Sequence, residues 1–244
     1  MNQYIQPTRL FQFVLRQASM NIVPSLIGIG AIFGIQLLVS LFAAYFFPTQ
    51  ITSLISLYLF IFVISGIVYT SGIFQELNSA ERGYAFLTLP VSTLEKMLGS
   101  WLLSSPLFIL VYFLLISLIY GLSTLVAHDM SSFTALFSQR TGNAIGGYLI
   151  AQTIFFLGAC TFKKNSLLKT LLSLFLIGVG LSICMAICAW FLFRGGIGTG
   201  GTFTWGVADF SGAGFNKTVH NIFLALLAPF LLLVSYFKLK EREV

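Results

Sequence analysis

The stretch FQELNSAERGYAFLTLPVSTLEKMLGSW, residues 74–101, decides the fold, because it separates two long apolar runs of the chain. The runs on both sides are long enough to cross a membrane, so we expect the stretch to join two spans at the membrane surface. It holds five of the chain's twenty Lys, Arg, Asp and Glu residues: Glu76, Glu81, Arg82, Glu95 and Lys96.

The second half of this stretch contains the signals of a helix start. Pro90 comes just before Ser92, which can cap a helix, and Glu95 follows three residues later, as in a capping box. We expect a short helix to begin at about Thr93 and to run toward the next span. Its first turn would lie at the membrane surface, where a soluble partner can touch it.

Outward from this stretch, the chain is mostly hydrophobic. Of its 244 residues 57% are hydrophobic and 8% are charged, whereas about a quarter of a soluble domain is charged. A hydrocarbon core of about 30 Å requires about 20 apolar residues in a helix. We therefore predict an all-α integral membrane protein with six transmembrane helices, at about 22–47, 51–74, 101–126, 144–162, 170–193 and 219–237.

The segments outside the spans differ in character. Residues 1–21 mix large apolar residues with Arg9 and Arg16, which favours an interfacial amphipathic helix over a frayed polar tail. The glycine-rich segment 194–218 is expected on the outer side, where it can re-enter the interface. Residues 238–244 form a basic tail.

Within the first span, Gly30 and Gly34 are four residues apart. This small-xxx-small spacing lets another helix approach closely, so we interpret the two glycines as a helix–helix packing site.

The basic residues predict the orientation, because cytoplasmic loops carry an excess of Lys and Arg. Arg140, Arg194 and Lys217 would lie outside. Ten would lie inside: Arg9, Arg16, Arg82, Lys96, Lys163, Lys164, Lys169, Lys238, Lys240 and Arg242. We therefore expect a multi-pass protein of the cell (inner, cytoplasmic) membrane with both termini in the cytoplasm. The same flanking positions explain the net charge of +6 without nucleic acid as a partner.

The sequence contains no residue pattern typical of an enzyme, a metal site or a proton-coupled transporter. The interiors of the expected spans carry no Asp, Glu, Lys or Arg, which a proton-coupled transporter would use. The chain also has no Walker A loop, no catalytic Ser/His/Asp set and no cluster with metal-ligand spacing. We expect no enzyme activity, no metal and no cofactor. Active transport would need a partner that supplies the energy.

The stretch GYAFLTLPVSTLEK, residues 83–96, resembles the membrane subunits of type-2 ABC transporters, many of which carry an LPVS-x-x-EK-like segment between their second and third spans. The resemblance implies six spans preceded by an interfacial helix. It also implies a cytoplasmic coupling helix between helices 2 and 3, and an outer re-entrant element between spans five and six. The counterparts here are residues 4–20, 75–98 and 194–218.

By this resemblance, the chain would form half of a translocation pathway, with a second permease subunit, identical or different, and a cytoplasmic ATP-binding subunit as partners besides membrane lipids. The docking positions that it implies are Glu76, Glu81, Arg82, Pro90, Glu95 and Lys96.

Two other functions stay open at the level of sequence. The chain could be a permease-like scaffold that anchors a larger complex and transports nothing. A passive channel is less favoured, because no span has the polar stripe that lines a water-filled pore. Ser65, Thr70 and Ser71 are the residues that keep a channel open as an alternative.

Overall fold

The structure is a computed structural model that describes residues 6–20, 22–74, 91–162, 164–193 and 213–243. Every element in these ranges is a helix, so the expected all-helical class is confirmed for the described chain. The elements are α1 (Pro7–Met20), α2 (Ile22–Phe46), η1 (Pro48–Ser53), α3 (Leu54–Gly72), α5 (Thr93–Leu102), η3 (Leu103–Leu107), α6 (Phe108–Val126), η4 (Met130–Phe137), α7 (Gln139–Thr161), α8 (Ser166–Phe193) and α9 (Ala213–Glu243).

Five stretches of the described chain are long and apolar enough to cross a membrane, as expected of a multi-pass membrane protein. They are Leu26–Phe46, Gln50–Gly72, Thr93–Val126, Ser131–Thr161 and Ser166–Cys188. These correspond to the first five expected spans. The sixth expected span, 219–237, lies in the long helix α9, which is not among the five.

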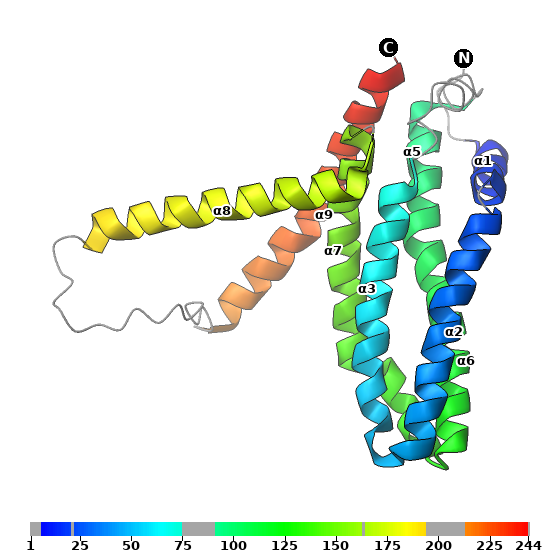
Figure 1. Ribbon diagram of the computed structural model, residues 1–244. Helices are drawn as coiled ribbons and strands as arrows, with labels where there is room; N and C mark the ends of the chain where they lie inside the picture. Colours follow the sequence, from blue (N-terminus) through cyan, green and yellow to red (C-terminus); the bar gives the residue numbers. More distant parts are fainter. Residues whose placement is uncertain (1–5, 21, 75–90, 163, 194–212, 244) are drawn as a thin grey trace.

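Four helices, α2, α3, α6 and α7, run side by side as an elongated bundle (Figure 1). At one end, which we call the α1 end, lie α1, α5 and the last turns of α9 (Figure 1). At the opposite end the short helices η1 and η4 connect α2 to α3 and α6 to α7. The first helix of the chain and the end of its last described helix therefore lie at the same end of the molecule.

Aromatic side chains fill the core of the bundle. Phe62 is fully buried, and its ring centroid lies 4.7 Å from that of Tyr148 and 5.1 Å from that of Tyr112. Gly66 makes room for this packing, since a Cβ atom there would overlap the Tyr148 ring. Ring pairs at these separations add to the area that they bury, so α3, α6 and α7 are joined by specific contacts.

Buried polar side chains add a second set of links between the same helices. Gln36 of α2 donates from Nε2 to the Tyr112 hydroxyl at 2.9 Å, and that hydroxyl donates to the Tyr58 carbonyl at 2.7 Å. All three side chains are at most 3% exposed. Because hydrocarbon offers no other partners, such bonds favour one arrangement of α2, α3 and α6.

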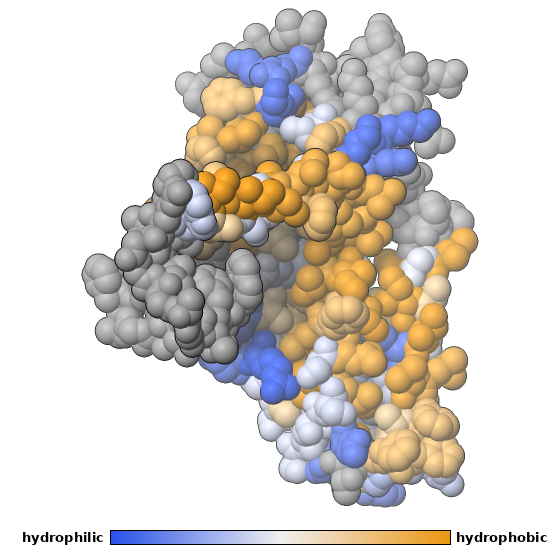
Figure 2. Space-filling view, turned by 60° about the vertical axis from the view of Figure 1, so that its left-hand side comes forward, coloured by the Kyte–Doolittle hydropathy of each residue, from blue (hydrophilic) through white to orange (hydrophobic). Residues whose placement is uncertain are grey.

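Helix α8 departs from the bundle at its first turns and runs away from it at a steep angle (Figure 1). The Ser166 hydroxyl donates to the Ser71 carbonyl at 2.7 Å, and Thr170 packs on Gly158. In the part of α8 with described side chains, Thr170 is the one buried residue of the candidate span Ser166–Cys188. Figure 2 shows apolar side chains along α8 and over the flank of the bundle.

At the opposite end, Asp129 precedes η4. Its carboxylate accepts hydrogen bonds from the hydroxyls of Ser131 at 2.6 Å and Ser132 at 2.5 Å. These bonds hold the pKa of Asp129 below its ordinary value, because they stabilise the ionised carboxylate. The Asp129 side chain therefore stabilises the turn that leads into η4.

Candidate functional site

Helix α5 begins at Thr93, where the sequence predicts a helix start, and the predicted capping box is confirmed. The Ser92 hydroxyl accepts from the Glu95 amide at 3.3 Å, and the Glu95 carboxylate accepts from the Ser92 amide at 2.9 Å. Both amides would otherwise lack a partner at the start of the helix.

The other carboxylate oxygen of Glu95 reaches a second helix. It accepts from the backbone amide of Gln6 at 2.8 Å, immediately before α1 begins at Pro7. The first helical bond of α1 runs from the Leu10 amide to the Gln6 carbonyl at 3.1 Å. One carboxylate thus satisfies amides at the starts of two helices, where the helix dipoles also favour negative charge.

Further contacts along α1 and α5 continue this junction. Gln17 accepts from the Ser100 hydroxyl at 3.1 Å and donates to the Ile73 carbonyl at 3.0 Å. A Cβ atom at Gly99 would lie 2.6 Å from the Phe13 ring, so only glycine permits this approach. We call α1 and α5, joined by these contacts, the α1–α5 unit.

This packing divides the residues of α1 between two faces. Phe13 and Gln17 are buried against α5, whereas Phe11 and Leu15 are 62% and 53% exposed. The helix expected in residues 4–20 is therefore present from Pro7, but one face of it lies on protein. Phe11 and Leu15 form the apolar face that remains open to a membrane interface.

The predicted docking residues fall into two groups. Glu76, Glu81, Arg82 and Pro90 lie outside the described residues, so their docking role stays a prediction. Glu95 and Lys96 are described, and each is only 2% exposed. Both side chains are buried within the protein. A partner that bound to α5 would therefore contact more exposed residues first.

The predicted packing glycines lie on an open surface. Apart from the neighbouring backbone of α2, no atom of the described residues lies within 4 Å of the position of a Cβ at Gly30 or Gly34. Among the described residues no other helix packs against them, and their use by a helix of another chain stays a prediction.

The sequence analysis does not predict two features of the site. The bond between Glu95 and Gln6 joins residues 89 positions apart, and no short motif carries that pairing. The second feature is η3, a π-helical turn that contains Pro106. Pro106, which follows Ser104 and Ser105 inside the expected third span, is the sequence signal that indicates a break in this helix.

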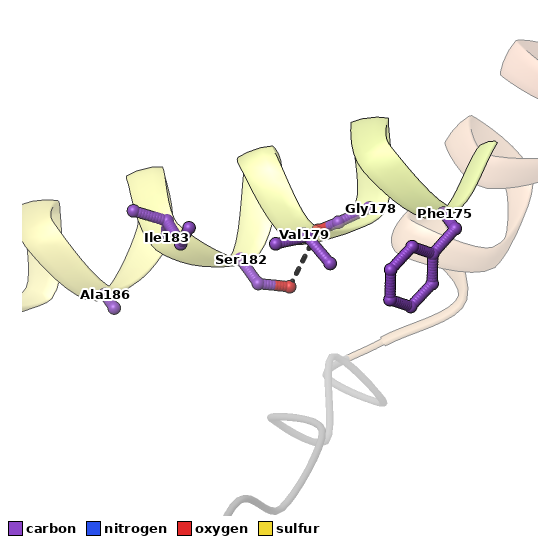
Figure 3. Close-up of a pocket in the computed structure, with 6 residues that line it drawn as sticks. All are labelled: Phe175, Gly178, Val179, Ser182, Ile183 and Ala186. Carbon is purple, nitrogen blue, oxygen red and sulfur yellow. Dashed lines mark hydrogen bonds between the residues drawn. The ribbon is translucent and has the colours of Figure 1, made fainter. Parts of the chain in front are cut away.

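A hollow of about 420 Å³ lies on α8, and Figure 3 shows that its lining residues all come from that helix: Phe175, Gly178, Val179, Ser182, Ile183 and Ala186. The Ser182 hydroxyl donates to the Gly178 carbonyl at 2.8 Å, so it is satisfied within α8. The hollow is thus an exposed helix face rather than an enclosed chemical site. Among the described residues, no group of three or more His, Cys, Asp or Glu side chains could hold a metal ion.

Comparison of the chain with protein-family models, with curated proteins and with solved structures gave no match. The resemblance to type-2 ABC permeases therefore rests on the residues quoted for it and on the predicted topology.

Proposed function

We propose that the chain is a permease subunit of an ATP-driven transporter of the type-2 ABC class. In this proposal it forms half of a translocation pathway with a second permease subunit. A separate cytoplasmic subunit hydrolyses ATP, since this chain carries no residues for that reaction. The α1 end faces the cytoplasm, as the distribution of basic residues favours.

The connection of α5 to the bundle helix α6 carries this proposal. The described run Thr93–Val126 leads from the capped start of α5, through η3, into the bundle helix α6. A protein that pressed on the α1–α5 unit would therefore act on α6 through η3. In this proposal the stretch 75–90 provides the contact with the ATPase, and Glu95 holds the starts of α1 and α5 together.

The test is a mild-detergent purification of the tagged chain, followed by measurement of ATPase activity in whatever copurifies. The docking variant is Glu81→Ala with Arg82→Ala. The matched control is Lys238→Ala with Glu241→Ala, which removes an exposed ion pair of 2.6 Å at the same end of the molecule. We expect the docking variant to lose the copurified ATPase and the control to retain it. Equal retention by both variants would contradict docking at 75–90.

A scaffold is the second candidate function, and the exposure of α8 favours it. A helix with an apolar surface and almost no buried side chains suits a protein that assembles with other membrane proteins. The same purification separates the two functions. Recovery of other membrane proteins without any ATPase would support the scaffold.

A further inference from the structure

The π-helical turn η3, Leu103–Leu107, interrupts the helical run between α5 and α6. In a π turn the carbonyl of one residue pairs with the amide five residues later. Pro106 within this turn has no N–H to donate to the carbonyls of the preceding turn. The Ser104 hydroxyl in the same turn donates to the Trp101 carbonyl at 3.3 Å. The turn therefore lacks one backbone donor at Pro106 and contains a side-chain donor at Ser104.

Helix α7 holds Ser104 from outside the turn. The Tyr148 hydroxyl donates to the Ser104 carbonyl at 2.6 Å, and Gln152 donates from Nε2 to the Ser104 hydroxyl at 2.7 Å. Tyr148 and Gln152 are four residues apart, hence on one face of α7, and all three residues are 0% exposed. These two bonds form a latch between α7 and the turn.

The same place also contains polar atoms that oppose this arrangement. The Ser105 hydroxyl and Gln152 Oε1 are buried and have no hydrogen-bond partner among the described protein atoms. An unpaired polar group in an apolar interior is unfavourable, so pairing these atoms in another arrangement would offset part of the loss of the two bonds to Ser104. The turn is thus both held by a latch and opposed by unpaired atoms, as expected of an element with two arrangements.

The position of the turn sets what would move. Helix α6 has 19 residues, which at 1.5 Å each span about 30 Å of hydrocarbon without help from α5. The α1–α5 unit lies beyond that length, on the far side of η3. Conversion of the π turn to regular α-helix would rotate α5 relative to α6 by up to about 100° and move it by about 1.5 Å along the axis, because the π turn accommodates one extra residue.

We propose that η3 is a hinge at which the α1–α5 unit changes its orientation relative to the bundle, with Tyr148 and Gln152 as its latch. The proposal does not depend on the proposed function, because the hinge belongs to this chain alone and is tested without any partner.

The test is a distance measurement between two spin labels on either side of the turn. Leu94 in α5 and Leu118 in α6 are 40% and 60% exposed, so both positions tolerate a label. The full chain, with its native cysteines replaced, is labelled at these positions and placed in lipid nanodiscs. We expect Gln152→Leu and Ser104→Ala to broaden or shift the distance distribution by several ångströms, because each removes part of the latch.

Two matched controls make the result specific. Gln36 is also a buried glutamine that donates from Nε2 to a neighbouring helix and has an unpaired Oε1, so Gln36→Leu makes the same change away from the turn. We expect it to leave the distribution unchanged. Ser105→Ala makes the same change as Ser104→Ala one residue along, but removes an unpaired hydroxyl, so we expect a narrower distribution.

The hinge is overturned if Gln152→Leu and Ser104→Ala give the distribution of the parent protein, or if Gln36→Leu changes it as much as they do. Pro106→Ala serves where a latch variant fails to fold, as judged by its elution profile. It restores an N–H to the turn, so we expect a narrower distribution, and an unchanged one overturns the hinge as well.

Discussion

The Glu95 carboxylate accepts hydrogen bonds from the amides of Ser92 and Gln6, and the sequence predicts only the first of these bonds. Its bond to Ser92 follows from a spacing of three residues, which the capping box defines. Its bond to Gln6 depends on how α1 and α5 meet in space, and local chemistry does not encode that meeting. The sequence therefore predicts Glu95 as a cap, whereas its role between two helices emerges only from the fold.

Replacement of Glu95 tests this double role. Glu95→Ala leaves amides at two helix starts without their acceptor, so we expect the free energy of unfolding to fall by about 1–3 kcal/mol. Glu95→Gln keeps one acceptor oxygen and should lose less. Thermal unfolding of the purified protein in detergent measures both. An unchanged melting temperature for Glu95→Ala would show that the two bonds contribute nothing.

At the scale of elements, Gly99 controls how closely α1 approaches α5. A Cβ at Gly99 would lie 2.6 Å from the Phe13 ring, so Gly99→Ala should destabilise the protein by about 1–3 kcal/mol through overpacking. Addition of Phe13→Leu should recover part of this loss, since it removes the ring that the new methyl group meets. Chemical denaturation of the single and double variants provides the comparison.

The matched control for this change is Gly34→Ala. No atom of the part of the chain that the structure describes, apart from the neighbouring backbone of α2, lies within 4 Å of a Cβ at that position. The higher helix propensity of alanine should therefore leave the chain as stable as before or more stable by up to about 1 kcal/mol. Equal destabilisation by both alanine substitutions would contradict a close approach at Gly99.

The bundle and α8 should respond differently to truncation of apolar side chains. Ile116 in α6 is 1% exposed, so Ile116→Ala leaves a cavity and should lower the free energy of unfolding by about 2–5 kcal/mol. Leu176 in α8 is 59% exposed, and Leu176→Ala should change the stability of the isolated chain much less. A large loss at Leu176 would mean that α8 is packed against protein in the purified sample.

Helix boundaries and helix packing differ in how far the sequence predicts them. The starts of α2 and α5 follow from hydropathy and from capping, which act over a few neighbouring residues. The direction of α8 does not follow from its composition, because Leu, Ile and Phe side chains suit lipid and protein equally well. The turn η3 depends on Tyr148 and Gln152, more than forty residues from Ser104, although Pro106 marks its place.

For the molecule as a whole, the shared position of α1 and the last turns of α9 predicts which residues face the same side of the membrane. Ser19→Cys and Lys240→Cys lie at the α1 end, and Thr134→Cys lies in η4 at the opposite end. With a membrane-impermeant thiol reagent on intact cells, we expect only the Thr134→Cys variant to be labelled, and all three after permeabilisation. Labelling of Ser19→Cys in intact cells would reverse the proposed orientation.

The meeting of the chain's first and last described helices at one end also makes covalent tandems practical. In the proposed orientation both lie on one side of the membrane, so a linker between two copies would not have to cross the bilayer and the two could be produced as a single polypeptide. A substitution can then be placed in one of the two copies only. Measurement of the activity of such a tandem would distinguish whether the proposed transporter requires one intact copy or two. An active tandem would also establish that identical subunits suffice.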